Sequence, residues 1–422
     1  MLDNNKAILI GVCLNKIEFS KKENCLKELA RLTDTAGLEV VGQFIQNRQR
    51  PDAAFYAGKG FLEKVINETG SEFPGVLIFD NELSASQNRN IEKEFELEAI
   101  DRTEVILNIF HEHARSREAQ LQVRLAELQY QLPRLKKLWS HLDREKGRAA
   151  GMSGAARGMG EKQIEVDRRI IRHEISQVKK ELVKVDRQKE IQRNQRDKIK
   201  KVCLIGYTNA GKSTLFNRLT DAGVLVEDKL FATLETTTRK LKLSKGRDLI
   251  LSDTVGFISD LPHHLIASFR ATLQDVRDAD LLLHIIDISD DNFENYIEEV
   301  NKVLVQIDAE KIPQFMVLNK LDKVDPIILK ERVNSRKKPI LVSAKSGENI
   351  AGLLDLIDDK LHNAKKYKLL IPHTEQKTVN NLHKLADIEN VDYLENGVSI
   401  IAVINREDLS HFVKYVVSSE NI

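Results

Sequence analysis

The residues best suited to chemistry in this sequence lie between Gly206 and Thr214. Two glycines, a lysine and two hydroxyl side chains follow one another there in the spacing G-x-x-x-x-G-K-S-T. Glycines let backbone N–H groups approach a phosphate closely, the lysine supplies a cation, and the serine hydroxyl can bind Mg2+. The sequence therefore predicts a phosphate-binding loop, which consists of Gly206, Tyr207, Thr208, Asn209, Ala210, Gly211, Lys212, Ser213 and Thr214.

Three further motifs indicate which nucleotide this loop holds. Asp253-Thr254-Val255-Gly256 offers a carboxylate for a metal-bound water and a backbone N–H for a γ-phosphate. In Asn319-Lys320-Leu321-Asp322, the last carboxylate can accept two hydrogen bonds from a guanine edge, which adenine cannot donate. Ser343-Ala344-Lys345 supplies a loop beside the base. In this order the motifs resemble the G domain of a GTPase, which implies GTP and GDP as ligands.

Another magnesium ligand is expected in the threonine-rich segment that precedes Asp253. A hydroxyl that closes over the γ-phosphate and is released after hydrolysis makes such a segment a switch. The residue types leave four candidates open, which are Thr233, Thr236, Thr237 and Thr238.

Two residues bear on the rate of hydrolysis. Phe257 stands where many small GTPases carry a glutamine that orients the attacking water, and a phenyl ring cannot hydrogen-bond that water. We therefore expect slow hydrolysis until a partner stimulates it. Asn209 resembles the asparagine of GTPases that recruit K+ beside the phosphates, which makes K+ a candidate cofactor. The alternative is a loop asparagine that tolerates left-handed geometry.

Short apolar runs precede the four motifs, at 202–205, 249–252, 315–318 and 340–342. Runs of this length predict buried strands, and a motif after each strand predicts an α/β nucleotide-binding fold. We expect this P-loop GTPase domain to span residues 200–363. Before it, apolar runs at 7–14, 38–45 and 76–79 alternate with helical stretches, which predicts an N-terminal α/β domain over residues 1–110.

A change of periodicity marks residues 111–199. Apolar side chains recur there three and four residues apart on two segments, first at Leu121, Leu125, Leu128, Leu132, Leu135 and Leu142, then at Ile164, Ile171, Ile175, Val178, Leu182 and Val185. This spacing predicts two amphipathic helices that fold back as an antiparallel coiled-coil hairpin. Five glycines between Gly147 and Gly160 predict a flexible tip. Beyond the GTPase domain, residues 364–422 predict a small C-terminal α/β domain that ends in a helix from about residue 407.

The net charge of +1 hides an uneven distribution. Residues 111–200 carry 23 Lys and Arg against 13 Asp and Glu, so the hairpin is basic. This asymmetry favours a basic arm that faces a polyanion such as RNA, although a solvated helix face is the alternative on charge alone. The scattered cysteines Cys13, Cys25 and Cys203 suit a reducing compartment. No apolar run approaches membrane-spanning length, so we expect a cytoplasmic protein without integral membrane contact.

Several sequence segments resemble those of the HflX family of translational GTPases. They are Leu83 to Asn90, Asp101 to Phe110, Ala114 to Val123, the start of the phosphate loop at Gly206, and Phe231-Ala232-Thr233-Leu234-Glu235. The resemblance spans nearly the whole chain. It implies that the metal-binding threonine is Thr233, and that Lys212, Thr233 and Gly256 act in catalysis. One departure is Met159, where the family tip usually has proline.

The resemblance also implies a partner and a task. The expected partner is the large ribosomal subunit with its rRNA, and the expected task is splitting or rescuing stalled or idle ribosomes under stress. We also expect a monomer that does not bind DNA. It would associate with ribosomes or peripherally with membrane. The alternatives are a GTPase of tRNA modification, a GTP-gated ribosome-assembly factor and a pure signalling switch, which leaves the basic hairpin unexplained.

Overall fold

The computed structural model describes residues 6–14, 19–70, 75–149, 155–194, 199–220, 223, 230–231, 236–243, 248–259, 262, 265, 273–334, 339–362, 364–405 and 408–420. The chain divides into two compact units, one of Met1–Lys240 with Ile250–Ser346 and one of Leu241–Leu249 with Gly347–Ile422. The α/β class predicted from the motifs is confirmed.

The N-terminal part of the first unit contains a parallel four-stranded sheet in the order β2-β1-β3-β4. Its strands are β1 (Lys6–Cys13), β2 (Glu39–Asn47), β3 (Gly75–Phe79) and β4 (Glu98–Asp101). Its helices are α1 (Phe19–Thr35), α2 (Lys59–Thr69), α3 (Ala85–Phe95) and α4 (Arg102–His113). The predicted alternation of strands and helices is present. The short β4 was not predicted, because only three of its four residues are buried and its apolar run is brief.

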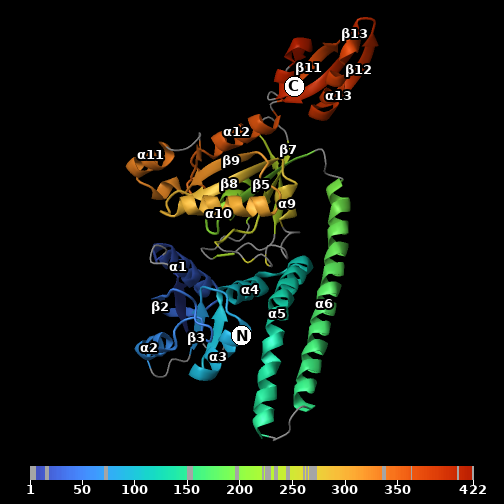
Figure 1. The fold of residues 1–422 in the computed structure, drawn as a ribbon. Helices are drawn as coiled ribbons and strands as arrows, with labels where there is room; N and C mark the ends of the chain where they lie inside the picture. The colour runs from blue at the N-terminus through green and yellow to red at the C-terminus, as the bar shows by residue number, and fades with distance from the viewer. Residues whose placement is uncertain are drawn as a thin grey trace. The chain divides into compact units, whose positions relative to one another are not determined.

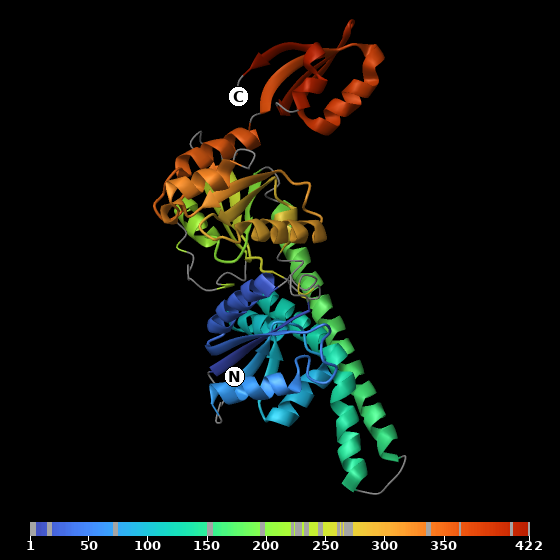
Figure 2. The ribbon, with the colours of Figure 1, turned by 60° about the vertical axis from the view of Figure 1, so that its left-hand side comes forward.

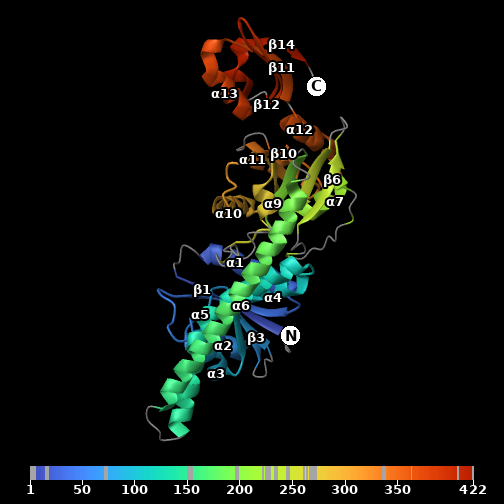
Figure 3. The ribbon, with the colours of Figure 1, turned by 90° about the vertical axis from the view of Figure 1, so that its right-hand side faces the viewer.

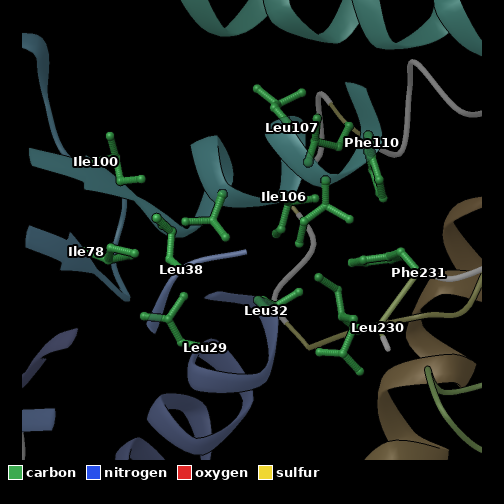
Figure 4. Close-up of a cluster of buried hydrophobic side chains, with 14 of the residues drawn as sticks. Leu29, Leu32, Leu38, Ile78, Ile100, Ile106, Leu107, Phe110, Leu230 and Phe231 are labelled. Atoms are coloured by element: carbon green, nitrogen blue, oxygen red, sulfur yellow. The ribbon is translucent and has the colours of Figure 1, made fainter. Parts of the chain in front are cut away.

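Both faces of this sheet are buried, because side chains alternate along a strand. Ala7 and Leu9 of β1 face a cluster with α1 and α4, whereas Ile8 and Ile10 face a cluster with α2 and α3. The first cluster also takes in Leu230 and Phe231, which come from beyond the phosphate loop in the sequence (Figure 4).

The two hairpin helices are α5 (Arg117–Ala149) and α6 (Ala155–Asn194). Arg124 pairs with Glu174 at 2.8 Å and Arg117 with Glu181 at 3.0 Å, so the numbering falls along α6 as it rises along α5. The helices are therefore antiparallel, and two views show them side by side (Figure 1 and Figure 2). The predicted flexible tip is corrected at its two ends, because residues 147–149 and 155–160 are helical despite their glycines. Its centre, residues 150–154, lies outside the described residues.

The GTPase sheet follows in the order β10-β9-β8-β5-β7-β6. Its two edge strands, β10 and β6, are labelled in Figure 3. Its strands are β5 (Lys200–Gly206), β6 (Thr237–Lys242), β7 (Asp248–Asp253), β8 (Leu281–Asp287), β9 (Gln314–Asn319) and β10 (Ile340–Leu341). Its helices are α7 (Lys212–Thr220), α9 (Gln274–Arg277), α10 (Phe293–Gln306) and α11 (Pro326–Asn334). The strands β5, β8, β9 and β10 are parallel, so the motifs that follow three of them meet at one edge.

The second unit contains α12 (Ile350–His362) and an antiparallel sheet in the order β12-β13-β11-β14. Its strands are β11 (Ala364–Ile371), β12 (Ala386–Leu394), β13 (Gly397–Asn405) and β14 (Val416–Glu420), with helix α13 (Gln376–Leu385). The predicted final helix is wrong, because Asp408–His411 and Val413–Tyr415 form short 3-10 helices before β14. Among the described residues, no helix has the length and apolar character to span a membrane.

Candidate nucleotide-binding site

The phosphate loop connects the end of β5 to the start of α7, and two of its positions exclude any side chain. A Cβ atom on Gly206 would lie 2.2 Å from the Ile285 carbonyl oxygen, and one on Gly211 would lie 2.3 Å from Asn319 Nδ2. Both glycines also have positive φ, at 149° and 94°. Asn209 adopts a φ of 60°, which is left-handed geometry. Tolerance of this geometry was the alternative to K+ recruitment for this residue.

Lys212 is buried at the first turn of α7. Its Nζ donates to the carbonyl oxygens of Gly206 at 3.1 Å and Tyr207 at 2.9 Å, which curls the side chain under the loop. Burial lowers the Lys212 pKa to about 8, and the nearby Asp253 carboxylate opposes this effect. The ammonium group is therefore held where an anion in the loop would stabilise its charge.

A hydroxyl and a carboxylate meet where a magnesium ion is expected. Ser213 Oγ donates to Asp253 Oδ2 at 2.6 Å. Asp253 is fully buried, its Oδ1 has no protein partner among the described residues, and burial raises its pKa. A buried acceptor of this kind is costly unless something pairs with it. Hard oxygen ligands beside a phosphate loop fit Mg2+ and its coordinated water.

The base-recognition motif is joined to the phosphate loop by Asn319. Its Nδ2 donates to the Ala210 carbonyl at 2.9 Å, and its Oδ1 accepts from the Ala344 N–H at 2.9 Å. Ser343 Oγ donates to Asp322 Oδ1 at 2.6 Å, which orients the carboxylate expected to read guanine. Three loops that are distant in sequence are thus brought together as predicted.

Two charged residues of this region were missed by the sequence reasoning. Asp287 ends β8 and pairs with Lys320 Nζ at 2.7 Å. Arg218 donates to the carbonyl oxygens of Ala344 at 3.3 Å and Lys345 at 2.6 Å, which holds the last loop. A carboxylate directly after an apolar strand is the signal that could have revealed Asp287. Arg218 looks like an ordinary helix residue in the sequence.

Gly256 lies against the phosphate loop. A Cβ atom added there would lie 2.6 Å from Thr208 Cγ2 and 3.1 Å from Lys212 Nζ. The next residue, Phe257, forms two backbone hydrogen bonds with the loop: its N–H donates to the Gly206 carbonyl at 3.2 Å, and its carbonyl accepts from the Thr208 N–H at 2.8 Å. Its ring is 3% exposed and packs in the apolar core, so it does not face the phosphate site.

The threonine-rich segment that holds Thr233 to Thr238, called switch I below, is only partly described. Ala232, Thr233, Leu234 and Glu235 lie outside the described residues, so the predicted Thr233 ligand stays a prediction. Thr237 and Thr238 belong to β6, where Thr238 Oγ1 lies 3.1 Å from Ser252 Oγ. The Phe231 ring packs edge-on against Phe110 of α4, with the two ring centres 4.7 Å apart (Figure 4). Its predicted contact with the nucleotide stays a prediction.

Comparison with known protein families finds matches in the N-terminal domain, the hairpin and the GTPase domain. Residues 23–111 match the family described as GTP-binding GTPase N-terminal, residues 113–196 the GTP-binding GTPase Middle Region, and residues 201–320 the 50S ribosome-binding GTPase. The chain is 41% identical over 400 residues to a GTPase HflX of Magnetococcus marinus, which covers 94% of this chain and 92% of that protein.

A GTPase HflX of Escherichia coli (strain K12) is 39% identical over 397 residues, covering 93% of this chain and 91% of that protein. Among solved structures, the crystal structure of SsGBP with GDP aligns with a TM-score of 0.47 and 24% identity, over 84% of this chain and 98% of that chain.

The phosphate loop, the metal-side pair and the base-recognition loops define a P-loop GTPase, an enzyme that hydrolyses GTP. Full-length relatives at about 40% identity place the chain within that class: it belongs to the GTPase HflX family.

Proposed function

We propose that this GTPase binds the large ribosomal subunit through its hairpin and rRNA contacts, and that it splits or rescues stalled or idle ribosomes under stress. The observation that carries the proposal is the match of residues 201–320 to the family described as a 50S ribosome-binding GTPase. The basic surplus of residues 111–200 supports the same partner, because RNA phosphates attract such a surface.

The middle of α5 is anchored to the N-terminal domain, as transmission of force through the hairpin requires. Arg134 of α5 pairs with the buried Asp101 at 2.9 Å and with Glu82 at 3.3 Å. Tyr130 donates to Glu104 at 3.1 Å, and the Arg134 guanidinium lies 3.4 Å from the Tyr130 ring centre. A force applied at the hairpin would therefore be transmitted to the N-terminal domain rather than absorbed by a loose joint.

The nucleotide cycle supplies the timing of this activity. Mg2+ would be held by Ser213, by Asp253 through water, and by Thr233 once switch I closes; it would neutralise charge on the phosphates. K+ beside Asn209 would add a further positive charge. With the Phe257 ring buried in the core, the chain places no water-orienting side chain at that position. Stimulation of hydrolysis by the ribosome would fill this gap.

The decisive experiment measures GTP turnover with and without purified large subunits, at low and at high K+. Strong stimulation by large subunits is the expected result. Fast intrinsic turnover without stimulation would contradict the proposal and favour tRNA modification or signalling. Sucrose-gradient profiles of ribosomes incubated with the protein and GTP distinguish a splitting factor from an assembly factor. A splitting factor converts assembled ribosomes to subunits, whereas an assembly factor leaves them intact.

A further inference from the structure

A buried tyrosine of the phosphate loop contacts the segment that follows Gly256. The Tyr207 hydroxyl donates to the Glu28 carboxylate of α1. The same oxygen accepts from the Ser259 N–H at 2.7 Å and lies 2.6 Å from Ser259 Oγ. Because the single phenolic proton goes to Glu28, both Ser259 groups act as donors. The ring is fixed as well, stacked on Tyr296 of α10 at 3.9 Å and 16°.

Arg102 holds the other side of Ser259. Its guanidinium is 7% exposed, pairs with Glu28 at 2.6 Å and Asp80 at 3.1 Å, and donates to the Ser259 carbonyl at 3.2 Å. Lys22 pairs with the same Asp80 at 2.7 Å, so two cations and two carboxylates balance in the buried cluster. Burial disfavours the Arg102 charge, but Glu28 and Asp80 outweigh it and raise the Arg102 pKa.

Ser259 therefore has its backbone N–H and carbonyl both bound by side chains. Tyr207 of the phosphate loop binds the N–H, and Arg102 of the N-terminal domain binds the carbonyl. All three residues lie in the first unit. Phe257 is held by backbone bonds to Gly206 and Thr208. The segment after Gly256 is thus fixed at two points, and this restricts the directions in which the Gly256 N–H can face. A donor aimed in advance at developing charge stabilises a transition state most.

We propose that Tyr207 is a positioning residue for GTP hydrolysis: its hydroxyl, oriented by Glu28 and Arg102 of the N-terminal domain, holds Ser259 and so aims the Gly256 N–H at the γ-phosphate. The N-terminal domain thereby contributes to the hydrolysis rate without touching the nucleotide. This role concerns intrinsic hydrolysis and does not depend on a ribosomal partner.

The test compares Tyr207→Phe with the unchanged protein in intrinsic GTP turnover and in affinities for GTP and GDP. The phenylalanine keeps the stack on Tyr296 and removes only the hydroxyl. We expect kcat to fall about tenfold, the effect of losing one buried hydrogen bond in the transition state. GDP affinity should stay within about twofold, because GDP has no γ-phosphate for Gly256 to meet.

Tyr296→Phe is the matched control, because it keeps the same stack and removes a neighbouring hydroxyl that forms none of the hydrogen bonds described above to Glu28 or Ser259. Its kcat should be unchanged. Glu28→Gln tests the same hydrogen bond from the N-terminal domain and should also lower kcat while leaving GDP affinity intact. It decides the question if Tyr207→Phe fails to fold.

Three outcomes would overturn the proposal. An unchanged kcat in both Tyr207→Phe and Glu28→Gln would show that the hydrogen bond between Tyr207 and Glu28 does not act on the reaction. Parallel loss of GTP and GDP affinity would assign Tyr207 to the fold of the loop alone. A rise in kcat would mean that the cluster holds switch II, which is Gly256 and the segment that follows it, away from the γ-phosphate.

Discussion

At the scale of single residues, Lys212 couples nucleotide binding to protons. Burial lowers its pKa to about 8, whereas phosphate oxygens beside Nζ would raise it. Below pH 8 the ammonium is already charged and binding needs no proton. Above pH 8 binding must take one up, so GDP affinity should fall by up to about tenfold per pH unit.

Titration calorimetry between pH 7 and 9.5, in two buffers of different ionisation enthalpy, measures this proton uptake directly. Lys212→Arg is the control, because a guanidinium stays charged throughout this range and should remove the dependence on pH. A GDP affinity that is flat from pH 7 to 9.5 in the unchanged protein would refute the assignment.

At the scale of elements, the junction of α4 and α5 contains an acid that titrates near neutrality. Burial raises the pKa of Glu104 to about 7, with a further contribution from the charge of Asp101. Asp101 is itself 1% exposed, and its pKa is also raised by burial. Groups facing the pair are Tyr130, Arg134 and Glu98. The folded protein therefore keeps a proton that the unfolded chain releases at lower pH.

The sign of the pH effect follows from this difference. Between the unfolded pKa of 4.5 and the folded pKa of about 7, the folded state binds more protons, so stability falls as pH rises. Replacing Glu104 by Gln should remove this loss, which amounts to at most about 3 kcal/mol. Denaturant midpoints of both proteins at pH 5, 6, 7 and 8 check it. Parallel curves would show that Glu104 does not titrate in this range.

The helices and strands also show which signals in the sequence were sufficient to predict secondary structure. The apolar runs before the four motifs predicted β5, β7, β9 and β10, because buried strands need continuous apolar residues. The apolar run of β8 precedes none of these motifs and was not predicted. The glycine-rich stretch misled the prediction of the tip: at 155–160 the backbone is helical, where local propensity argues against it. The final helix failed for a similar reason, because pairing of Val416–Glu420 with β11 overrides a helical pattern.

The candidate site was predictable where chemistry and spacing coincide. The phosphate loop and base-recognition loops each carry their ligand-binding residues within a few positions. The hydrogen bonds of Tyr207 were not predictable, because its partners Glu28 and Ser259 are separated from it by 179 and 52 residues. Interactions between distant segments depend on how the elements pack, which no local pattern encodes.

At the scale of the whole first unit, two adjacent residues face two different parts of the molecule. Asp101 binds Arg134 of the hairpin, and Arg102 binds Ser259 after the switch II glycine. Both sit where β4 passes into α4, and Asp101 caps that helix by accepting from the Glu104 N–H at 3.1 Å. A displacement of α5 at Arg134 would therefore reach Ser259 through the two adjacent residues Asp101 and Arg102.

The hairpin itself should bind large subunits by ion pairs with RNA phosphates. The side chains of Arg169, Arg172, Lys179 and Lys180 are exposed on α6. Changing these four residues to Gln should weaken binding and lower the slope of log affinity against log salt by about 0.7 to 0.9 for each phosphate that is no longer neutralised. GTP turnover without ribosomes should not change, because none of these four residues contacts the nucleotide-site residues described above. Co-sedimentation with large subunits from 50 to 300 mM KCl measures both quantities.

A matched control removes the same number of charges elsewhere, from the exposed Lys27, Lys64, Lys330 and Lys377. If binding depends on the hairpin, this variant keeps the salt slope of the unchanged protein, since the charges it removes lie outside the RNA-binding surface. If both variants lose affinity equally, the attraction comes from net charge alone. The hairpin would then be a spacer rather than the binding arm, and the basic surplus of residues 111–200 would reflect only a solvated helix face.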